Sequence, residues 1–204
     1  MGRRALRVVP LLAAAVLLGL LGAGSLALAH GGHHTHDGPR GGDTAEHHSH
    51  DGCGNDDKPY SAWDEQWLMM SIEGDLFEIQ GGKLAQSKGT TDKVRALGAR
   101  LVKDHSKSLQ DATDLANSLG IDVPDSPSPS QQWELRVVSS FSGIAFDRWY
   151  ADLEVQDHMQ DIQEAEDEVE KGCNPDIRQL AADELPVLRE HLALAQAALE
   201  ASSH

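Results

Sequence analysis

The sequence predicts an all-α protein built as a four-helix bundle, with a long crossover between the second and third helices. Four segments of nearly equal length each carry apolar residues at helical spacing on one face, as helices do when they pack around a shared core. No segment alternates apolar and polar residues as a half-buried strand would. A proline-rich stretch between the second and third helices is far longer than an ordinary bundle turn.

The first 29 residues are expected to form a secretory signal peptide. Arg3, Arg4 and Arg7 make a basic beginning, residues 8–21 are apolar, and residues 27–29 read Ala-Leu-Ala, a typical cleavage site. Cleavage there predicts an exported protein, located in the periplasm, in the cell envelope or outside the cell, with no membrane span left. A retained signal anchor is the alternative.

Residues 30–59 form a tail of Gly, Asp and His with almost nothing apolar to bury, so we expect it to be disordered. It contains two similar blocks in which imidazoles stand beside carboxylates. Such blocks suit Cu²⁺, Zn²⁺ or Ni²⁺, and metal ions are therefore the expected partners of the tail. The histidines of the two blocks are His33, His34, His36, His47, His48 and His50.

The first two helices are predicted at residues 62–87 and 92–119. On the first, helical periodicity places Glu73 inside the apolar arc and Glu78 towards the polar side. On the second, apolar residues gather on one face and His105 falls at the centre of that face. An imidazole in the middle of an apolar stripe indicates a polar group inside the bundle.

The rest of the chain completes the bundle. Residues 122–129 contain three prolines and cannot be helical, and a short helical piece is expected at 131–140. The third and fourth helices are predicted at 144–171 and 175–202, with a kink at Pro186. A connection that crosses the whole length of a bundle between its second and third helices is the ferritin-like arrangement.

Two cysteines test this topology. Cys53 precedes the first helix and Cys173 follows the third. In an up-down-up-down bundle they would lie at opposite ends, roughly 40 Å apart, whereas a crossover brings them to the same end. A disulfide needs Cα atoms within about 7 Å, and an exported chain with two cysteines favours one. We therefore predict a Cys53–Cys173 disulfide, with two free thiols as the alternative.

Three histidines fall near the midpoints of three helices, each on the apolar stripe. Because mid-height is shared whichever way the helices run, His105, His158 and His191 are expected to meet in one polar layer. Buried imidazoles need partners, so the layer is predicted to hold a metal ion, to form a structural polar network, or to respond to protons. The carboxylates expected near this level are Glu184 and either Glu73 or Glu78.

The ligand pattern argues against a bridged di-iron site. Such sites need Glu-x-x-His on two helices, but the positions three before the histidines are Val102, Val155 and Leu188. A mononuclear site with three imidazoles and one carboxylate fits better, with the metal open among Cu, Zn, Ni and Fe. Adjacent helical residues point about 100° apart, so the acids directly before the histidines are expected to be outer or surface groups; they are Asp104, Asp157 and Glu190.

The charge balance excludes one large class of partner. The chain has 17 Lys and Arg against 33 Asp and Glu, a formal net charge of −16. Such a surface repels nucleic acid and favours cations. No basic patch with interleaved aromatic residues is present in the sequence, so nucleic-acid binding is not expected.

Five motifs resemble those of a known family. They read EIQGGKLA at 78–85, DHS at 104–106, GIAFDRWY at 143–150, DH at 157–158 and LPVLREHL at 185–192. In this order they resemble a secreted bacterial family catalogued as domain of unknown function 4142, often labelled "predicted outer membrane protein" and placed among ferritin-like bundles. The resemblance implies a crossover bundle outside the cytoplasm with histidines at these positions. It favours Glu78 over Glu73 and implies no settled activity.

The function that the sequence favours is binding of a transition metal ion outside the cytoplasm, with a role in metal buffering or stress. An enzyme is less favoured. The first alternative is a non-enzymatic structural or interaction bundle whose histidine layer is a polar network. The second is a ferritin-like oxidase.

Overall fold

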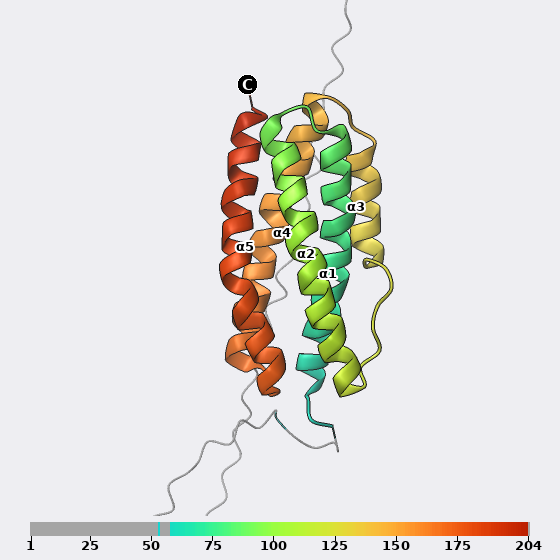
Figure 1. Ribbon diagram of the computed structural model, residues 1–204, viewed down its shortest axis with the longest axis vertical. Coiled ribbons are helices and arrows are strands. Elements are labelled where there is room, and N and C mark those ends of the chain that lie inside the picture. Colours follow the sequence, from blue (N-terminus) through green and yellow to red (C-terminus); the bar gives the residue numbers. More distant parts are fainter. Residues whose placement is uncertain (1–52, 54–57, 204) are drawn as a thin grey trace, which may run out of the picture. The chain divides into compact units, whose positions relative to one another are not determined.

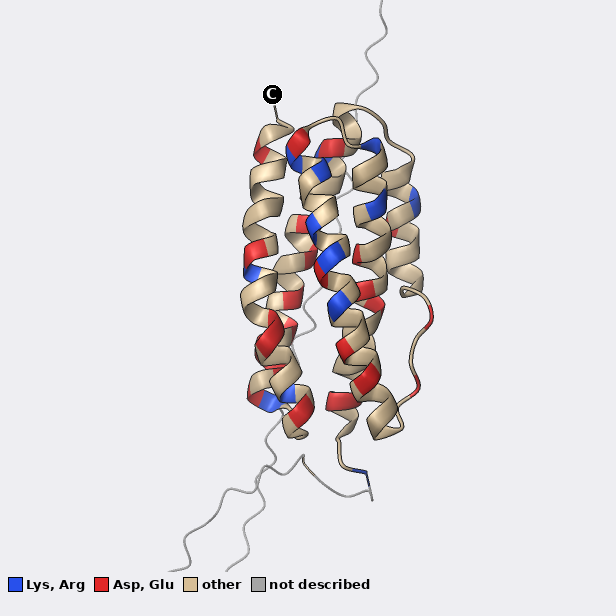
Figure 2. Ribbon diagram, in the orientation of Figure 1, with Lys and Arg blue, Asp and Glu red and all other residues tan. Residues whose placement is uncertain are grey.

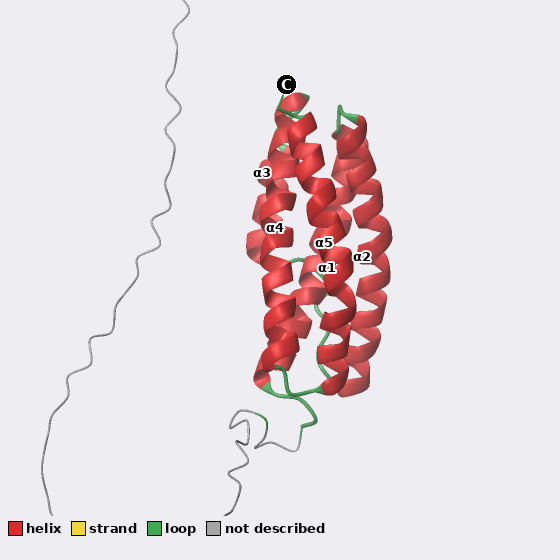
Figure 3. Ribbon diagram, turned by 90° about the vertical axis from the view of Figure 1, so that its left-hand side faces the viewer, coloured by secondary structure: helices red, strands yellow, loops and turns green. Residues whose placement is uncertain are grey.

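The computed structural model describes residue 53 and residues 58–203, which form five helices and no strand (Figures 1 and 3). The predicted signal peptide lies outside the described residues, as does the predicted tail apart from Cys53, Lys58 and Pro59. The predicted helix boundaries are confirmed to within two residues. The helices are α1 (Ala62–Lys88), α2 (Asp92–Leu119), α3 (Pro129–Ser139), α4 (Ile144–Lys171) and α5 (Pro175–Ala201).

Contacts at one end of the bundle establish the crossover. Asp147, in the first turn of α4, accepts hydrogen bonds from the backbone N–H groups of Thr90 at 2.8 Å and Thr91 at 2.7 Å, in the turn before α2. Helices α2 and α4 therefore begin at the same end and run parallel. The connection between them, which includes α3, runs back along the length of the bundle (Figure 1). The predicted all-α bundle with a long crossover is confirmed.

Contacts at the other end join the start of α1 to the turn between α4 and α5. The buried carboxylate of Asp64 accepts from the backbone N–H of Cys173 at 2.7 Å and of Asn174 at 3.1 Å. Asn174 also caps α5 and donates its side-chain amide to the carbonyl of Pro59 at 2.9 Å. The predicted disulfide closes this end, with the Cα atoms of Cys53 and Cys173 5.4 Å apart.

The core consists of two apolar clusters, one towards each end of the bundle. The first lies where α1 and α5 begin and includes Trp67 and Ile177. The second lies where α2 and α4 begin and includes Val94 and Phe146. Between them, at mid-height, the helices present buried polar side chains. Pro186 lies inside α5, which continues through it as one helix.

None of the five helices in the described part combines the length and apolarity needed to cross a membrane.

Helices α1 and α2 touch through two glycines. A Cβ atom added to Gly98 would lie 2.5 Å from the carbonyl oxygen of Gly82, and one added to Gly82 would lie 2.7 Å from the carbonyl oxygen of Gly98. Real Cβ atoms do not approach backbone oxygen so closely. The glycines therefore let the two backbones meet and fix the height at which α1 faces α2.

We predict that Gly98→Ala lowers the free energy of unfolding by about 1–3 kcal/mol, because the added methyl group forces two backbones apart. Gly74→Ala is the matched control in the same bundle, since an added Cβ there meets nothing within 4 Å. Its better helix propensity should raise stability by up to about 1 kcal/mol. Urea unfolding followed by circular dichroism measures both. Equal effects of the two substitutions would contradict the close contact.

Candidate metal centre

Three imidazoles from three helices meet in the interior at mid-height. His105 of α2 is 6% exposed, while His158 of α4 and His191 of α5 are fully buried. The ring centroids lie 5.1 Å apart for His105 and His191, 5.2 Å for His158 and His191, and 5.9 Å for His105 and His158. Each ring offers a nitrogen to a set in which all three atoms lie within 4.8 Å of one another. The structure thus brings the three sequence-predicted histidines together.

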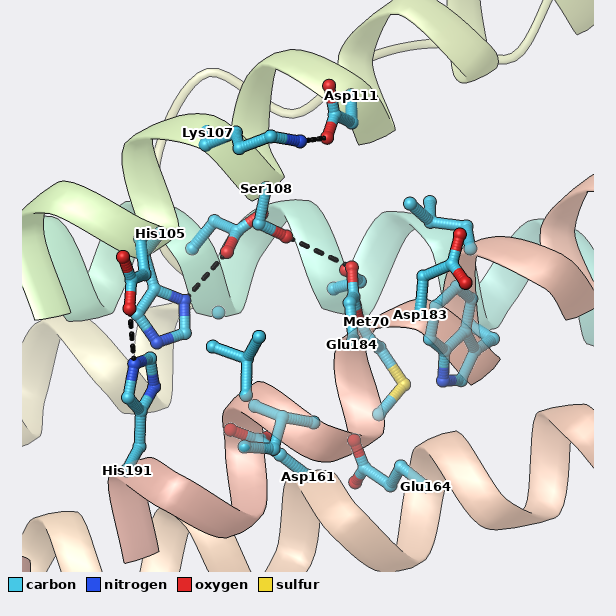
Figure 4. A pocket seen from close by; sticks show the side chains of 18 of the residues that line it. Met70, His105, Lys107, Ser108, Asp111, Asp161, Glu164, Asp183, Glu184 and His191 are labelled. Carbon is cyan, nitrogen blue, oxygen red and sulfur yellow. Dashed lines mark hydrogen bonds and ion pairs between the residues drawn. The ribbon is translucent and has the colours of Figure 1, made fainter. Parts of the chain in front are cut away.

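One nitrogen of each ring is held by an acceptor. His158 Nδ1 donates to the carbonyl oxygen of Glu154 at 2.9 Å, and His191 Nε2 donates to Asp104 Oδ2 at 3.0 Å. His105 Nδ1 lies 2.8 Å from Asp75 Oδ1 and donates to it when Asp75 is ionised. Figure 4 shows His105 and His191 close together, each joined by a dashed line to its carboxylate.

The other nitrogen of each ring is buried without a hydrogen-bond partner in the described part. These atoms are Nε2 of His105, Nε2 of His158 and Nδ1 of His191. When the first nitrogen carries the hydrogen, the second carries the lone pair. His158 and His191 therefore each present to the interior a lone-pair nitrogen that no described residue uses. His105 does the same once Asp75, whose pKa burial raises well above its ordinary value, is ionised.

Burial keeps these imidazoles neutral. It lowers the pKa of His105 to about 4, of His158 to about 3 and of His191 to about 4. Neighbouring imidazoles add to the lowering for His158 and His191. A neutral imidazole is the form that binds a metal ion, so at neutral pH all three rings are in the ligand form.

An ion-pair network stands behind His191. Arg100 pairs with Asp104 and donates two hydrogen bonds to Glu190, at 2.9 and 2.8 Å. Burial raises the pKa of Asp104, but hydrogen bonds from Arg100 and His191 outweigh it and leave that pKa below its ordinary value. Asp104 is therefore a charged acceptor for His191. The outer positions expected for Asp104 and Glu190 match this arrangement.

The same expectation is wrong for Asp157. Its Oδ2 is buried in the bundle, and one of its carboxylate oxygens lies within 4.8 Å of carboxylate oxygens of Glu78 and Asp161.

Two further carboxylates lie beside His158, those of Glu78 in α1 and Glu154 in α4, each 1% exposed. His158 Nδ1 lies 3.8 Å from Glu78 Oε1 and 3.8 Å from Glu154 Oε2. Burial and the neighbouring Glu154 raise the pKa of Glu78 well above its ordinary value. Burial also raises the pKa of Glu154, to about 8.

The structure corrects the placement of Glu73. Helical periodicity puts Glu73 on the inward face, but it is partly exposed and takes no part in the ligand clusters of the described residues. The inward acids of α1 at the level of the imidazoles are instead Asp75 and Glu78. Periodicity misplaces them because acids on the inward face make that face look polar. The family resemblance, which favours Glu78, agrees with the structure.

Apolar periodicity gives no sign of three further acids that lie at this level, namely Asp75, Glu154 and Asp161. Glu154 lies four residues before His158 and Asp161 lies three residues after it, so Glu154, His158 and Asp161 share one face of α4. On α1, Asp75 lies three residues before Glu78. An acid one turn from an inward histidine or acid is the signal that would have found them.

A cavity of about 300 Å³ reaches the imidazole layer from the surface and touches His105 and His191 (Figure 4). Among its charged lining residues, seven acids outnumber the two bases Arg100 and Lys107, and acids are also frequent over the lower half of the bundle in Figure 2. The cavity therefore favours cations. The lining acids are Asp75, Asp104, Asp111, Asp161, Glu164, Asp183 and Glu184.

Glu184 lies in this cavity rather than beside the imidazoles. Its Oε1 accepts a hydrogen bond from Ser108 Oγ at 3.0 Å, and it belongs to none of the ligand clusters in the described part. Burial and the nearby Asp75 raise its pKa to about 8.

The six predicted tail histidines lie outside the described residues: His33, His34, His36, His47, His48 and His50.

Comparisons with known proteins agree with the fold. The model of a family described as "Domain of unknown function (DUF4142)" matches residues 54–198. The crystal structure of a DUF305 fragment from Deinococcus radiodurans is similar, with a TM-score of 0.62 and 12% sequence identity, over 70% of this chain and 98% of that one. At this identity the likeness concerns the fold alone. No curated protein matches the chain.

We predict that Glu184→Gln changes how stability depends on pH. The pKa of Glu184 is higher in the folded chain than in the unfolded one, so its protonated form stabilises the fold at low pH and this contribution is lost as pH rises from about 4.5 to 8. The neutral glutamine has no such loss. The stability of the variant relative to the wild type should therefore increase by more than about 1 kcal/mol between pH 5 and pH 8. A difference that does not vary with pH in urea unfolding would contradict the assignment.

Proposed function

Because the chain belongs to the DUF4142 family, whose description assigns no function, its role has to be inferred from the site, and we propose that it is a metal-binding protein that holds a divalent transition metal ion between His105, His158 and His191. One observation carries this proposal: each imidazole has one nitrogen held by an acceptor and the other buried without a partner.

The acceptors behind the rings are those typical of metal-binding histidines. Such histidines almost always donate their second ring N–H to a carboxylate or a backbone carbonyl, which fixes the tautomer and the ring orientation. Here two rings are held by the carboxylates of Asp75 and Asp104, and the third by the carbonyl of Glu154. A layer with a purely structural role would gain more from hydrogen bonds at both nitrogens of each ring.

The spacing also suits a metal ion. Ligand nitrogens in a tetrahedral zinc site lie about 3.4 Å apart when each bond is about 2.1 Å long. The three imidazoles offer nitrogens within 4.8 Å of one another, so small side-chain movements would close the set around an ion. Imidazole ligands suit Zn²⁺, Cu²⁺, Ni²⁺ and Fe²⁺, and the acidic cavity gives cations a route to the layer.

The wider setting of the proposal is metal capture and buffering outside the cytoplasm. The disulfide is typical of an oxidising compartment. The histidine blocks of the tail would collect metal ions that the bundle then holds. Binding is favoured over oxidase chemistry because the three imidazoles form one compact set of ligands without the Glu-x-x-His pairs of di-iron enzymes.

The test is a Zn²⁺ titration against a chelator, using the full chain with all seven histidines of residues 30–59 replaced by serine, namely His30 and the six of the two blocks. We predict one tightly bound equivalent in this background. His105→Gln, His158→Gln and His191→Gln should each abolish tight binding while the helical circular dichroism signal is kept. If the background protein binds no zinc and the three substitutions change only its stability, the layer is a structural network and the proposal is wrong.

We also predict that Asp104→Asn weakens Zn²⁺ binding by about 10–100-fold, because the amide holds His191 less firmly than the carboxylate does. The matched control is Glu190→Gln, which alters the far side of the same network and does not touch the imidazole. It should change the affinity much less. Equal losses would show that Asp104 acts through general charge rather than by orienting the ring.

A further inference from the structure

A second group of unpartnered polar atoms lies beside the imidazoles, between α1 and α4. Both carboxylate oxygens of Glu78, both of Glu154, Oδ2 of Asp157 and the hydroxyl of Tyr150 are buried without a hydrogen-bond partner in the described part. Glu78, Glu154 and Tyr150 are each 1% exposed. Buried polar groups are nearly always satisfied in native proteins, so six such atoms in one place require an explanation.

The oxygens of this group lie within reach of one ion. Carboxylate oxygens of Glu78, Asp157 and Asp161 are within 4.8 Å of one another, and Glu78 and Glu154 form a second such set with His158. Glu78 belongs to both sets and so stands at their centre. Glu154, Asp157 and Asp161 face it from α4, where their spacing of three and four residues places them on one side of the helix.

No cationic side chain in the described part neutralises this group. Among residues 58–203, no Lys or Arg forms an ion pair with Glu78, Glu154, Asp157 or Asp161. The imidazole of His158 lies 3.8 Å from both Glu78 and Glu154, but it is neutral, and its Nδ1–H is already donated to the carbonyl of Glu154. Buried carboxylates without a cation must be protonated, hydrated or bound to a metal ion.

We propose that Glu78, Glu154, Asp157 and Asp161 form a second cation position, separate from the three imidazoles and adjacent to them through His158. Its ligands are oxygen atoms, which suit hard divalent cations such as Mn²⁺ and Mg²⁺ rather than the ions that imidazole prefers. The hydroxyl of Tyr150 supplies a further oxygen at the edge of the group. The bundle thus offers a nitrogen-rich and an oxygen-rich position side by side, for two cations of different class.

The test uses Mn²⁺ as the probe and the full chain. Free Mn²⁺ gives a six-line electron paramagnetic resonance signal that is lost on binding to protein. We expect one equivalent to bind per chain, and Glu154→Gln to weaken binding by at least about tenfold. Glu73→Gln is the matched control, because Glu73 is an acid of α1 outside both oxygen sets, and it should leave binding unchanged. Asp161→Asn, at a less buried position, replaces Glu154→Gln if that variant does not fold.

The outcomes separate this proposal from that of the imidazole site. Mn²⁺ binding that persists in His105→Gln supports a separate oxygen-rich position, even if zinc binding fails. A free Mn²⁺ signal that is unchanged by the wild-type chain overturns the proposal and leaves protons or water as the partners of these acids. Equal loss in Glu73→Gln and Glu154→Gln also overturns it, because binding would then belong to the acidic surface.

Discussion

The hydrogen bond between each buried imidazole and the acceptor behind it is the interaction on which the interior depends. Asp75 of α1 holds His105 of α2, and Asp104 of α2 holds His191 of α5. These bonds therefore join neighbouring helices across the layer. They also make the burial of polar groups tolerable between two apolar clusters, because an unpaired polar group there would cost a few kcal/mol. The unpaired nitrogens that remain are the feature that a metal ion would explain.

The rest of the fold sets the heights at which these groups meet. The glycine contact between α1 and α2 fixes one pair of helices, and the hydrogen bonds of Asp147 and Asp64 fix the two ends of the bundle. The crossover makes α2 and α4 parallel, and the imidazoles meet at one level because each stands near the midpoint of its helix. A shift by one helical turn, about 5.4 Å, would separate the rings by more than any metal–ligand distance.

Sequence periodicity predicted the fold and the histidines, but only part of the acidic surroundings. Each histidine falls among apolar residues at helical spacing, and these apolar residues show that the imidazole points inward. On α1 and α4 the inward face carries several acids, and apolar periodicity then gives no direction. For this reason Glu73 was favoured over Glu78, and Glu154 was overlooked. The disulfide was predictable because the topology leaves Cys53 and Cys173 at one end.

The most direct measurement is anomalous X-ray scattering above and below the zinc absorption edge, on crystals of the full chain grown with Zn²⁺. We expect a zinc peak at mid-height, about 2.0–2.1 Å from Nε2 of His105, Nε2 of His158 and Nδ1 of His191. Density for water hydrogen-bonded to these nitrogens, with zinc found only elsewhere on the chain, would contradict it.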